Sequence, residues 1–193
     1  MSFVTGTQTE CLYSLGASVT KNTYTTIAAI TGVAGTNTIC SIPPGFFNND
    51  GPNPVGRALA LEVWGTIANT SAATFAMNFN VNPTVATSTG NLAVNTAYTP
   101  LAANTTPWSL FVRMTCTAFA TSTFTLQING QVRYENVASG GAPATGDQCA
   151  GFQGTIASLD PRVQQYVELF GTWNASAAGN TTTVQQMFLW GLN

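Results

Sequence analysis

Three glutamates are the residues of this sequence that could carry acid–base chemistry. Glu62, Glu135 and Glu168 lie in segments that alternate like strands, and a pair of carboxylates on either side of a sugar linkage could hydrolyse it. Each glutamate falls on the outward parity of its strand, beside neutral polar neighbours. That placement is typical of solvated or hydrogen-bonded strand residues, so we expect all three to be structural rather than catalytic.

The other common kinds of active site lack a residue type. The chain contains no histidine, so no Ser or Cys nucleophile has the usual base to activate it, and the commonest zinc ligand is missing. The four cysteines are far apart, with no Cys-x-x-Cys pair, and we expect them to be reduced and buried; they are Cys11, Cys40, Cys116 and Cys149. The sequence therefore predicts a protein that is not an enzyme and has no metal or other cofactor.

Charge is scarce throughout the chain. Charged residues make up 6%, with five cations, seven carboxylates and a net charge of −2, whereas Thr and Asn number 31 and 17. Five scattered cations do not form a nucleic-acid-binding surface, and no apolar run is long enough to span a membrane. The first eight residues carry no sign of a secretion signal. A mean hydropathy of +0.15 with so little charge suits a subunit packed beside copies of itself.

Four segments alternate apolar and polar residues with the period of a strand. Over 57–67 the apolar parity holds leucine, valine and isoleucine, and over 75–82 it holds phenylalanine, methionine and valine. Over 108–117 it runs from Trp108 to Cys116. In 123–135, Asn129–Gly130 could form a two-residue hairpin turn, but one apolar parity continues through it. We therefore favour a single long strand with Gly130 at a bend or close contact.

The last part of the chain, 163–192, is predicted to be a terminal hairpin with 174–180 as its turn. The apolar residues of each half share one parity, in the second half Val184, Phe188, Trp190 and Leu192. A helix beginning at Asp160-Pro161 is the alternative for the first half, but the Thr172-Trp173-Asn174 ending favours a strand.

The remaining segments complete one domain over 1–193, with 1–10 a candidate extended N-terminal arm. Strands are expected around 10–19, 23–31 and 37–42, and long loops over 43–56, 82–107 and 136–158. About eight antiparallel strands in one domain predict an all-β sandwich of the jelly-roll type, with long loops between strands. An immunoglobulin-like Greek-key sandwich is the alternative fold.

Two aromatic residues in the first long loop are candidates for contact with a partner. Phe46 and Phe47 lie in a Pro- and Gly-rich segment, where they could contact another chain or tuck beneath their own loop. The sequence leaves both possibilities open.

The C-terminal segment resembles the closing strands of small structural proteins of tailed bacteriophages. The shared pattern is an Asp-containing turn at Asp160, an alternating strand ending in Thr172-Trp173-Asn174, a small-residue loop, and Asn180-Thr-Thr-Thr before the last strand. Upstream, Leu59-x-Leu-x-Val-Trp-Gly65 and Trp108-x-Leu-x-Val-Arg-Met-Thr115 fit the same pattern. The resemblance covers most of 57–193 in organisation and is close only near the end.

The resemblance implies a jelly-roll capsid decoration (cement) protein. Such proteins sit on the outside of the phage head, commonly as homotrimers, and clamp neighbouring major capsid protein subunits. On this reading the partners are the protein itself and the major capsid protein, the location is the outer surface of the virion, and there are no catalytic residues to transfer. The alternative is a tail or head-fibre component that presents its loops to a host glycan or receptor. Two further readings stay open: a β-rich glycan hydrolase, and a major shell subunit of a jelly-roll virus.

Overall fold

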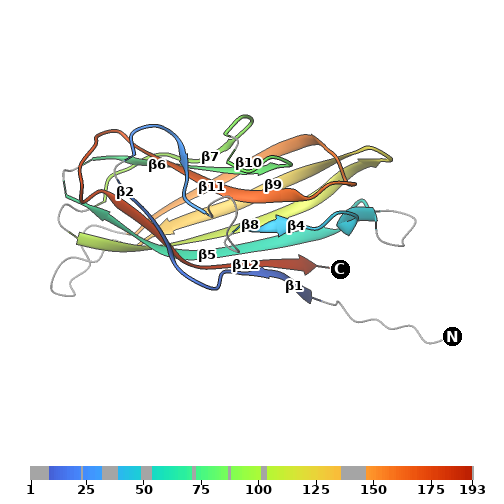
Figure 1. The fold of residues 1–193 in the computed structure, drawn as a ribbon, viewed down its shortest axis with the longest axis horizontal. Coiled ribbons are helices and arrows are strands. Elements are labelled where there is room, and N and C mark those ends of the chain that lie inside the picture. Colours follow the sequence, from blue (N-terminus) through green and yellow to red (C-terminus); the bar gives the residue numbers. More distant parts are fainter. Residues whose placement is uncertain are drawn as a thin grey trace.

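The computed structural model describes residues 9–22, 24–31, 39–48, 54–70, 73–86, 88–100, 104–135 and 147–192. Within these ranges the protein is built almost entirely from antiparallel β-strands (Figure 1). The strands are β1 (Thr9–Ser14), β2 (Val19–Asn22), β3 (Ala28–Ala29), β4 (Ser41–Ile42), β5 (Ala58–Asn69), β6 (Phe75–Asn82), β7 (Leu92–Tyr98), β8 (Asn104–Ala120), β9 (Thr123–Tyr134), β10 (Gln148–Leu159), β11 (Gln165–Trp173) and β12 (Thr181–Leu192). A single 3₁₀ turn, Phe46–Asn48, is the helical element of the described residues.

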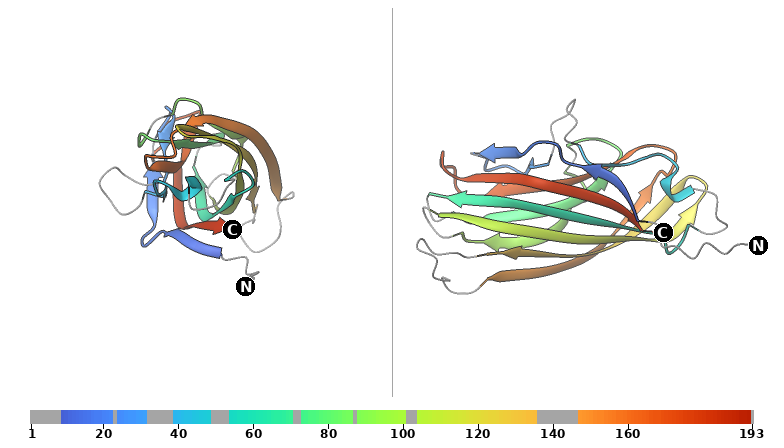
Figure 2. Two further views of the ribbon diagram at one scale, coloured as in Figure 1. Left: turned by 90° about the vertical axis from the view of Figure 1, so that its right-hand side faces the viewer. Right: turned by 90° about the horizontal axis from the view of Figure 1, so that it is seen from below.

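The strands form two sheets that pack face to face. The seven-stranded sheet has the order β1-β12-β5-β8-β9-β10, with β2 also paired to β12. The five-stranded sheet has the order β3-β11-β6-β7, with β4 also paired to β11. Viewed along the long axis, the two sheets curve around a common interior (Figure 2).

The order of the strands is that of a jelly roll. We count β1 and β2 as one interrupted strand, count β3 and β4 as another, and leave out the β9–β10 hairpin, which gives eight strands. In this numbering the strand order is 1-8-3-6 in the first sheet and 2-7-4-5 in the second. The β9–β10 hairpin extends the first sheet beyond this eight-stranded frame. The predicted fold is therefore confirmed, and the immunoglobulin-like alternative is not adopted.

The alternating segments place their apolar parity in the core, as predicted. Every second side chain of β5, β6, β8 and β9 is buried between the sheets. These inward residues are Leu59, Leu61, Val63, Ile67, Phe75, Met77, Phe79, Val81, Trp108, Leu110, Val112, Met114, Cys116, Phe124, Leu126, Ile128, Val132 and Tyr134.

The segment 123–135 is one strand, and Gly130 lies at a close contact. A Cβ atom on Gly130 would overlap the ring of Phe152 on β10 and stand 3.1 Å from the carbonyl oxygen of Phe111. The glycine thus makes room for Phe152, which packs against Phe79 of the other sheet with ring centroids 6.4 Å apart.

The predicted terminal hairpin is wrong. β11 pairs with β3, β4 and β6 in one sheet, whereas β12 pairs with β1, β2 and β5 in the other. The segment 174–180 therefore crosses between the sheets. The helix alternative for 160–170 is not adopted either, because residues 161–163 form a turn and bend and β11 begins at Gln165.

Two of the predicted long loops contain strands. β7 lies within 82–107, and β10 occupies most of the described part of 136–158. β7 pairs with β6 through repeated register shifts, and its large apolar residues Leu92, Val94 and Tyr98 share one parity. β10 is rich in Gly, Gln and Ala and is held by its main-chain pairing with β9. In the first part of the chain, β1 and β2 replace the single strand expected at 10–19, and the described residues of 23–31 and 37–42 contain the two-residue strands β3 and β4. Residues 1–8 of the candidate N-terminal arm lie outside the described residues, and residues 9 and 10 belong to β1.

Candidate interaction face

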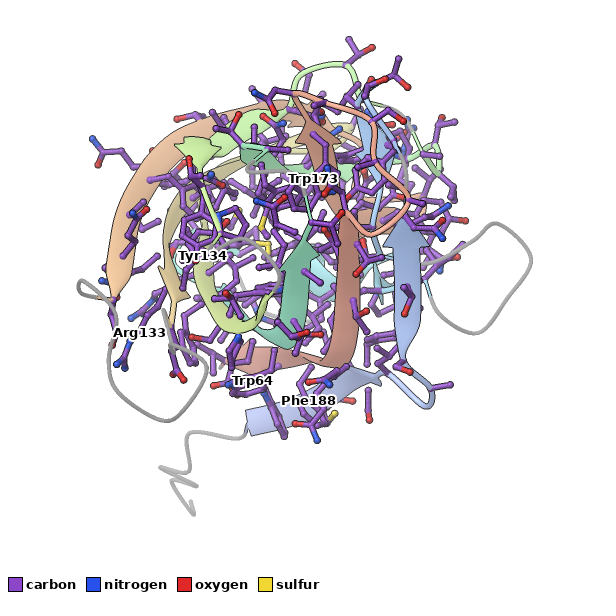
Figure 3. All side chains as sticks on the ribbon, turned by 90° about the vertical axis from the view of Figure 1, so that its left-hand side faces the viewer. Trp64, Arg133, Tyr134, Trp173 and Phe188 are labelled. Carbon is purple, nitrogen blue, oxygen red and sulfur yellow. The ribbon has the colours of Figure 1, made fainter. Side chains whose placement is uncertain are left out.

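The outer surface of the seven-stranded sheet carries a cluster of aromatic side chains. We call it the aromatic face and define it by Trp64 on β5, Phe111 on β8, and Phe188 and Trp190 on β12. Figure 3 shows Trp64 and Phe188 together on the outside of this sheet, while Tyr134 and Trp173 point into the interior. The four side chains come from three neighbouring strands, so the sheet itself holds them in place.

The rings of the aromatic face touch one another. Trp64 meets Phe111 edge to face at 5.8 Å between centroids and meets Phe188 at 6.1 Å. Phe188 and Trp190 lie nearly parallel, 5.9 Å apart. Phe111 is 45% exposed, more than any other large hydrophobic side chain of the described residues. Trp64, Phe188 and Trp190 are partly buried. A connected group of exposed and partly exposed aromatic rings on a sheet is the kind of apolar surface that marks an interaction site.

A β-bulge in β12 decides that Phe188 and Trp190 face outward. The register between β12 and β5 shifts between Val184 and Gln186, so the side-chain parity changes at that point. Val184 is buried before the bulge, and Met187 and Leu189 are buried after it. The sequence had placed Val184, Phe188, Trp190 and Leu192 on one face. That prediction is wrong, because the bulge separates the valine from the other three.

One carboxylate lies in the middle of the aromatic face. Glu62 is opposite Phe188 on one side and Phe111 on the other, and Trp64 is the next outward residue along its own strand. The Glu62 side chain is half-buried. The outward parity that the sequence assigned to Glu62 is confirmed, but its neighbours are aromatic rings.

One cation lies beside that carboxylate. Arg113 is exposed on β8, opposite Ala60 and two residues along from Phe111, which makes it a diagonal neighbour of Glu62. The ion pairs found within the described ranges are Arg133–Asp147 and Arg162–Asp160, so Glu62 and Arg113 pair neither with each other nor with another described residue. A shallow hollow of about 480 Å³ lies between them, lined by Ala60, Leu61, Glu62, Phe111, Val112, Arg113, Asn129, Gly130, Gln131 and Leu192.

The three glutamates considered for catalysis do not come together. Glu62 lies on the outer face of the seven-stranded sheet, Glu168 belongs to the five-stranded sheet, and Glu135 follows the end of β9. The described residues also contain no group of three or more His, Cys, Asp or Glu side chains that could hold a metal ion. No helix among them is both long and apolar enough to cross a membrane.

Phe46 and Phe47 pack within the chain. Phe47 is buried, and its ring lies 4.8 Å from that of Phe124. Phe46 is partly buried, with the Arg57 guanidinium 5.1 Å from its ring centroid, and Arg57 Nη1 donates a 2.6 Å hydrogen bond to the Phe46 carbonyl. The sequence left open whether these rings contact another chain or tuck beneath their own loop. Phe47 is tucked beneath its loop, and a buried ring has no surface to offer a partner. The sequence alone did not predict the aromatic face. Its residues come from three strands, and only the pairing register of those strands shows that they are neighbours.

The cysteines divide into two pairs by burial. All four are free; Cys40 and Cys116 are buried, whereas Cys11 and Cys149 are exposed. The buried position predicted for Cys116 on the inward face of its strand is confirmed. The burial expected of Cys11 and Cys149 is wrong, because both lie on the outside of the fold. Cys149 lies on the edge strand β10 and accepts a 2.7 Å hydrogen bond from Gln131 Nε2.

Glu168 is covered rather than solvated. It lies on β11 with 1% of its surface exposed, and the backbone N–H of Ala86 donates to both carboxylate oxygens at 3.0 Å. Burial raises the pKa of this carboxyl, and the Ala86 hydrogen bond opposes that rise only in part. Ala86 itself has a positive φ of 58°, so the loop after β6 closes over Glu168 in a strained conformation.

The Glu168→Gln substitution is expected to remove a pH dependence of stability. Because the folded pKa is raised, the folded state keeps this proton to higher pH than the unfolded state does. The stabilising contribution is full below the unfolded pKa and is lost as the pH rises through the folded pKa. Urea unfolding of both proteins from about pH 4 to pH 8 would measure the difference. The prediction would be contradicted if the free energy of unfolding of the wild type and that of the variant changed with pH to the same extent.

Comparison with known proteins assigns no family to this chain. No protein-family model matches the sequence, and no curated protein matches it. Among solved structures, the chain is similar to the CBM2 module of the evolved Dit of Lactobacillus casei BL23 phage J-1. The match has 11% identity and a TM-score of 0.33 and covers 97% of each chain. At that level it carries no assignment of function, which has to come from the surface and the sequence of this chain.

Proposed function

We propose that this protein is a non-enzymatic structural component of a phage virion, which decorates the outside of the head and stabilises contacts between major capsid subunits. The observation that carries the proposal is the aromatic face. Its four rings lie on adjacent paired strands, and Phe111, on β8 at one side of the group, is 45% exposed. Aromatic anchors surrounded by polar residues are what protein interfaces use for most of their binding energy.

The scarcity of charge agrees with an assembly role. A chain with 6% charged residues and a net charge of −2 has little electrostatic repulsion to overcome when many copies pack on one surface. Weak contacts repeated by symmetry then add to a strong lattice through effective concentration. The virion setting is supported by the C-terminal residue pattern, which resembles that of small structural proteins of tailed phages.

The proposal is tested by counting this protein in purified particles of the phage that encodes it. Quantitative mass spectrometry would give its copy number relative to the major capsid protein. A comparable number is expected for a protein that covers the head. A number far below it would reject head decoration and point to the tail or a fibre, where a glycan or receptor becomes the ligand to test. Absence from the particle would reject both.

A pair of substitutions links the copy number to the aromatic face. Phe111→Ser is expected to reduce incorporation into particles at least about tenfold, because it removes the most exposed anchor of the face. Val163→Ser is the matched control, since Val163 is 43% exposed and lies at the turn before β11, away from the face. Equal incorporation of the two variants would contradict a role for the face.

A further inference from the structure

The charges on the aromatic face restrict what can cover it. Glu62 and Arg113 have opposite signs and make no ion pair with any residue in the described part of the chain. They are diagonal neighbours on β5 and β8, so their Cα atoms lie about 7–8 Å apart by the usual geometry of antiparallel strands. A purely apolar partner would bury both charges without supplying either with a counter-charge, and an uncompensated buried charge strongly disfavours a contact.

A partner that fits the face must therefore bring a cation to Glu62 and an anion to Arg113, at the same spacing. A second copy of this chain meets the requirement. In a two-fold contact, if residue i of one copy meets residue j of the other, then j of the first also meets i of the second. An axis that lies in the interface and passes between Glu62 and Arg113 would bring each of them opposite the other residue of the second copy.

We propose that the aromatic face is a two-fold contact between two copies of this chain, closed by two reciprocal Glu62–Arg113 ion pairs. Phe111 lies opposite Glu62 and two residues from Arg113, so it sits near the axis and can meet its own counterpart. Phe188, Trp64 and Trp190 extend the contact along β5 and β12. The inference rests on the proposed function only in treating this face as an assembly surface. It differs from the three-fold trimer that the sequence resemblance implies.

The test is the mass of the full-length protein in solution, measured by sedimentation and light scattering. The wild-type chain is expected to have twice its 20.2 kDa mass. Glu62→Arg and Arg113→Glu each place like charges opposite one another at both pairs, and each is expected to raise the dissociation constant about 100-fold or more. Mixed in equal amounts, the two variants are expected to form a dimer again, because every pair in the mixed dimer joins opposite charges.

Two controls keep the experiment specific. Glu10→Arg makes the same change of charge on the exposed part of β1 and is expected to leave the dimer intact. Circular dichroism of each variant shows whether it is folded, and recovery in the mixture cannot come from an unfolded chain. A wild-type mass of one or three copies would overturn the proposal, and so would single variants that dimerise like wild type or a mixture that stays monomeric. The copy number of the wild-type protein in virions is measured separately and can be high or low whether or not two copies pair through this face, so the two proposals can fail separately.

Discussion

The Gly65→Ala substitution is expected to destabilise the protein by about 3 kcal/mol or more, the largest effect of a single added methyl group among the described glycines. Gly65 lies on β5 between Trp108 of β8 and Val184 of β12. A Cβ atom there would overlap the carbonyl oxygen of Thr183 and stand 2.7 Å from the indole of Trp108. The oxygen belongs to the backbone of a paired strand, so it cannot move aside as a flexible side chain would.

Urea unfolding monitored by tryptophan fluorescence would measure the loss. Gly151→Ala is the matched control, because Gly151 is also in a strand and the nearest atom to its added Cβ would be 3.9 Å away. We expect that variant to differ from wild type by no more than about 0.5 kcal/mol. A similar small effect at Gly65 would mean that β5 and β12 can separate locally without cost, and that the bulge does not fix their register.

The Asn69→Ala substitution is expected to cost about 3 kcal/mol, because it leaves several buried backbone groups without partners. Asn69 is fully buried at the end of β5, and its Nδ2 donates to the carbonyls of Ala73 at 3.1 Å and Pro100 at 3.2 Å. Its Oδ1 accepts a 3.2 Å hydrogen bond from the Ala73 N–H. One side chain thereby closes the β5–β6 connection and ties it to the segment after β7.

Asn174→Ala provides a graded comparison at the same end of the sandwich. Asn174 is exposed, and its Oδ1 accepts a single 2.8 Å hydrogen bond from the Thr74 N–H. Its loss is expected to cost about 1 kcal/mol, which thermal or urea unfolding would resolve from the Asn69 effect. If the two substitutions cost the same, the buried hydrogen bonds of Asn69 are not what holds these connections together.

The aromatic face and the low charge of the chain belong to one physical account. A face with exposed rings would promote unspecific association if it carried no polar group. Glu62 in its centre and Arg113 beside it penalise partners that cannot pair both charges. In the proposed two-fold contact the same two residues supply the penalty against other partners and the attraction to a second copy.

The class of fold and the inward side of the main strands follow from the amino-acid sequence alone. The apolar parity of 57–67, 75–82, 108–117 and 123–135 is a local property of period two, and it faces the core in every case. The absence of histidine and of clustered cysteines is likewise a property of the chain alone.

The tertiary structure decided which strands are neighbours and where parity changes. β11 and β12 are adjacent in sequence but lie in different sheets, and β7 and β10 are strands within segments predicted to be loops. The bulge after Val184 turns Phe188 and Trp190 outward, and the loop around Ala86 covers Glu168. Alternation records which side of one strand is apolar. Contacts with residues far away in the chain determine which sheet a strand joins, in what register it pairs, and which loop covers a side chain such as Glu168. Such contacts leave no local period in the sequence.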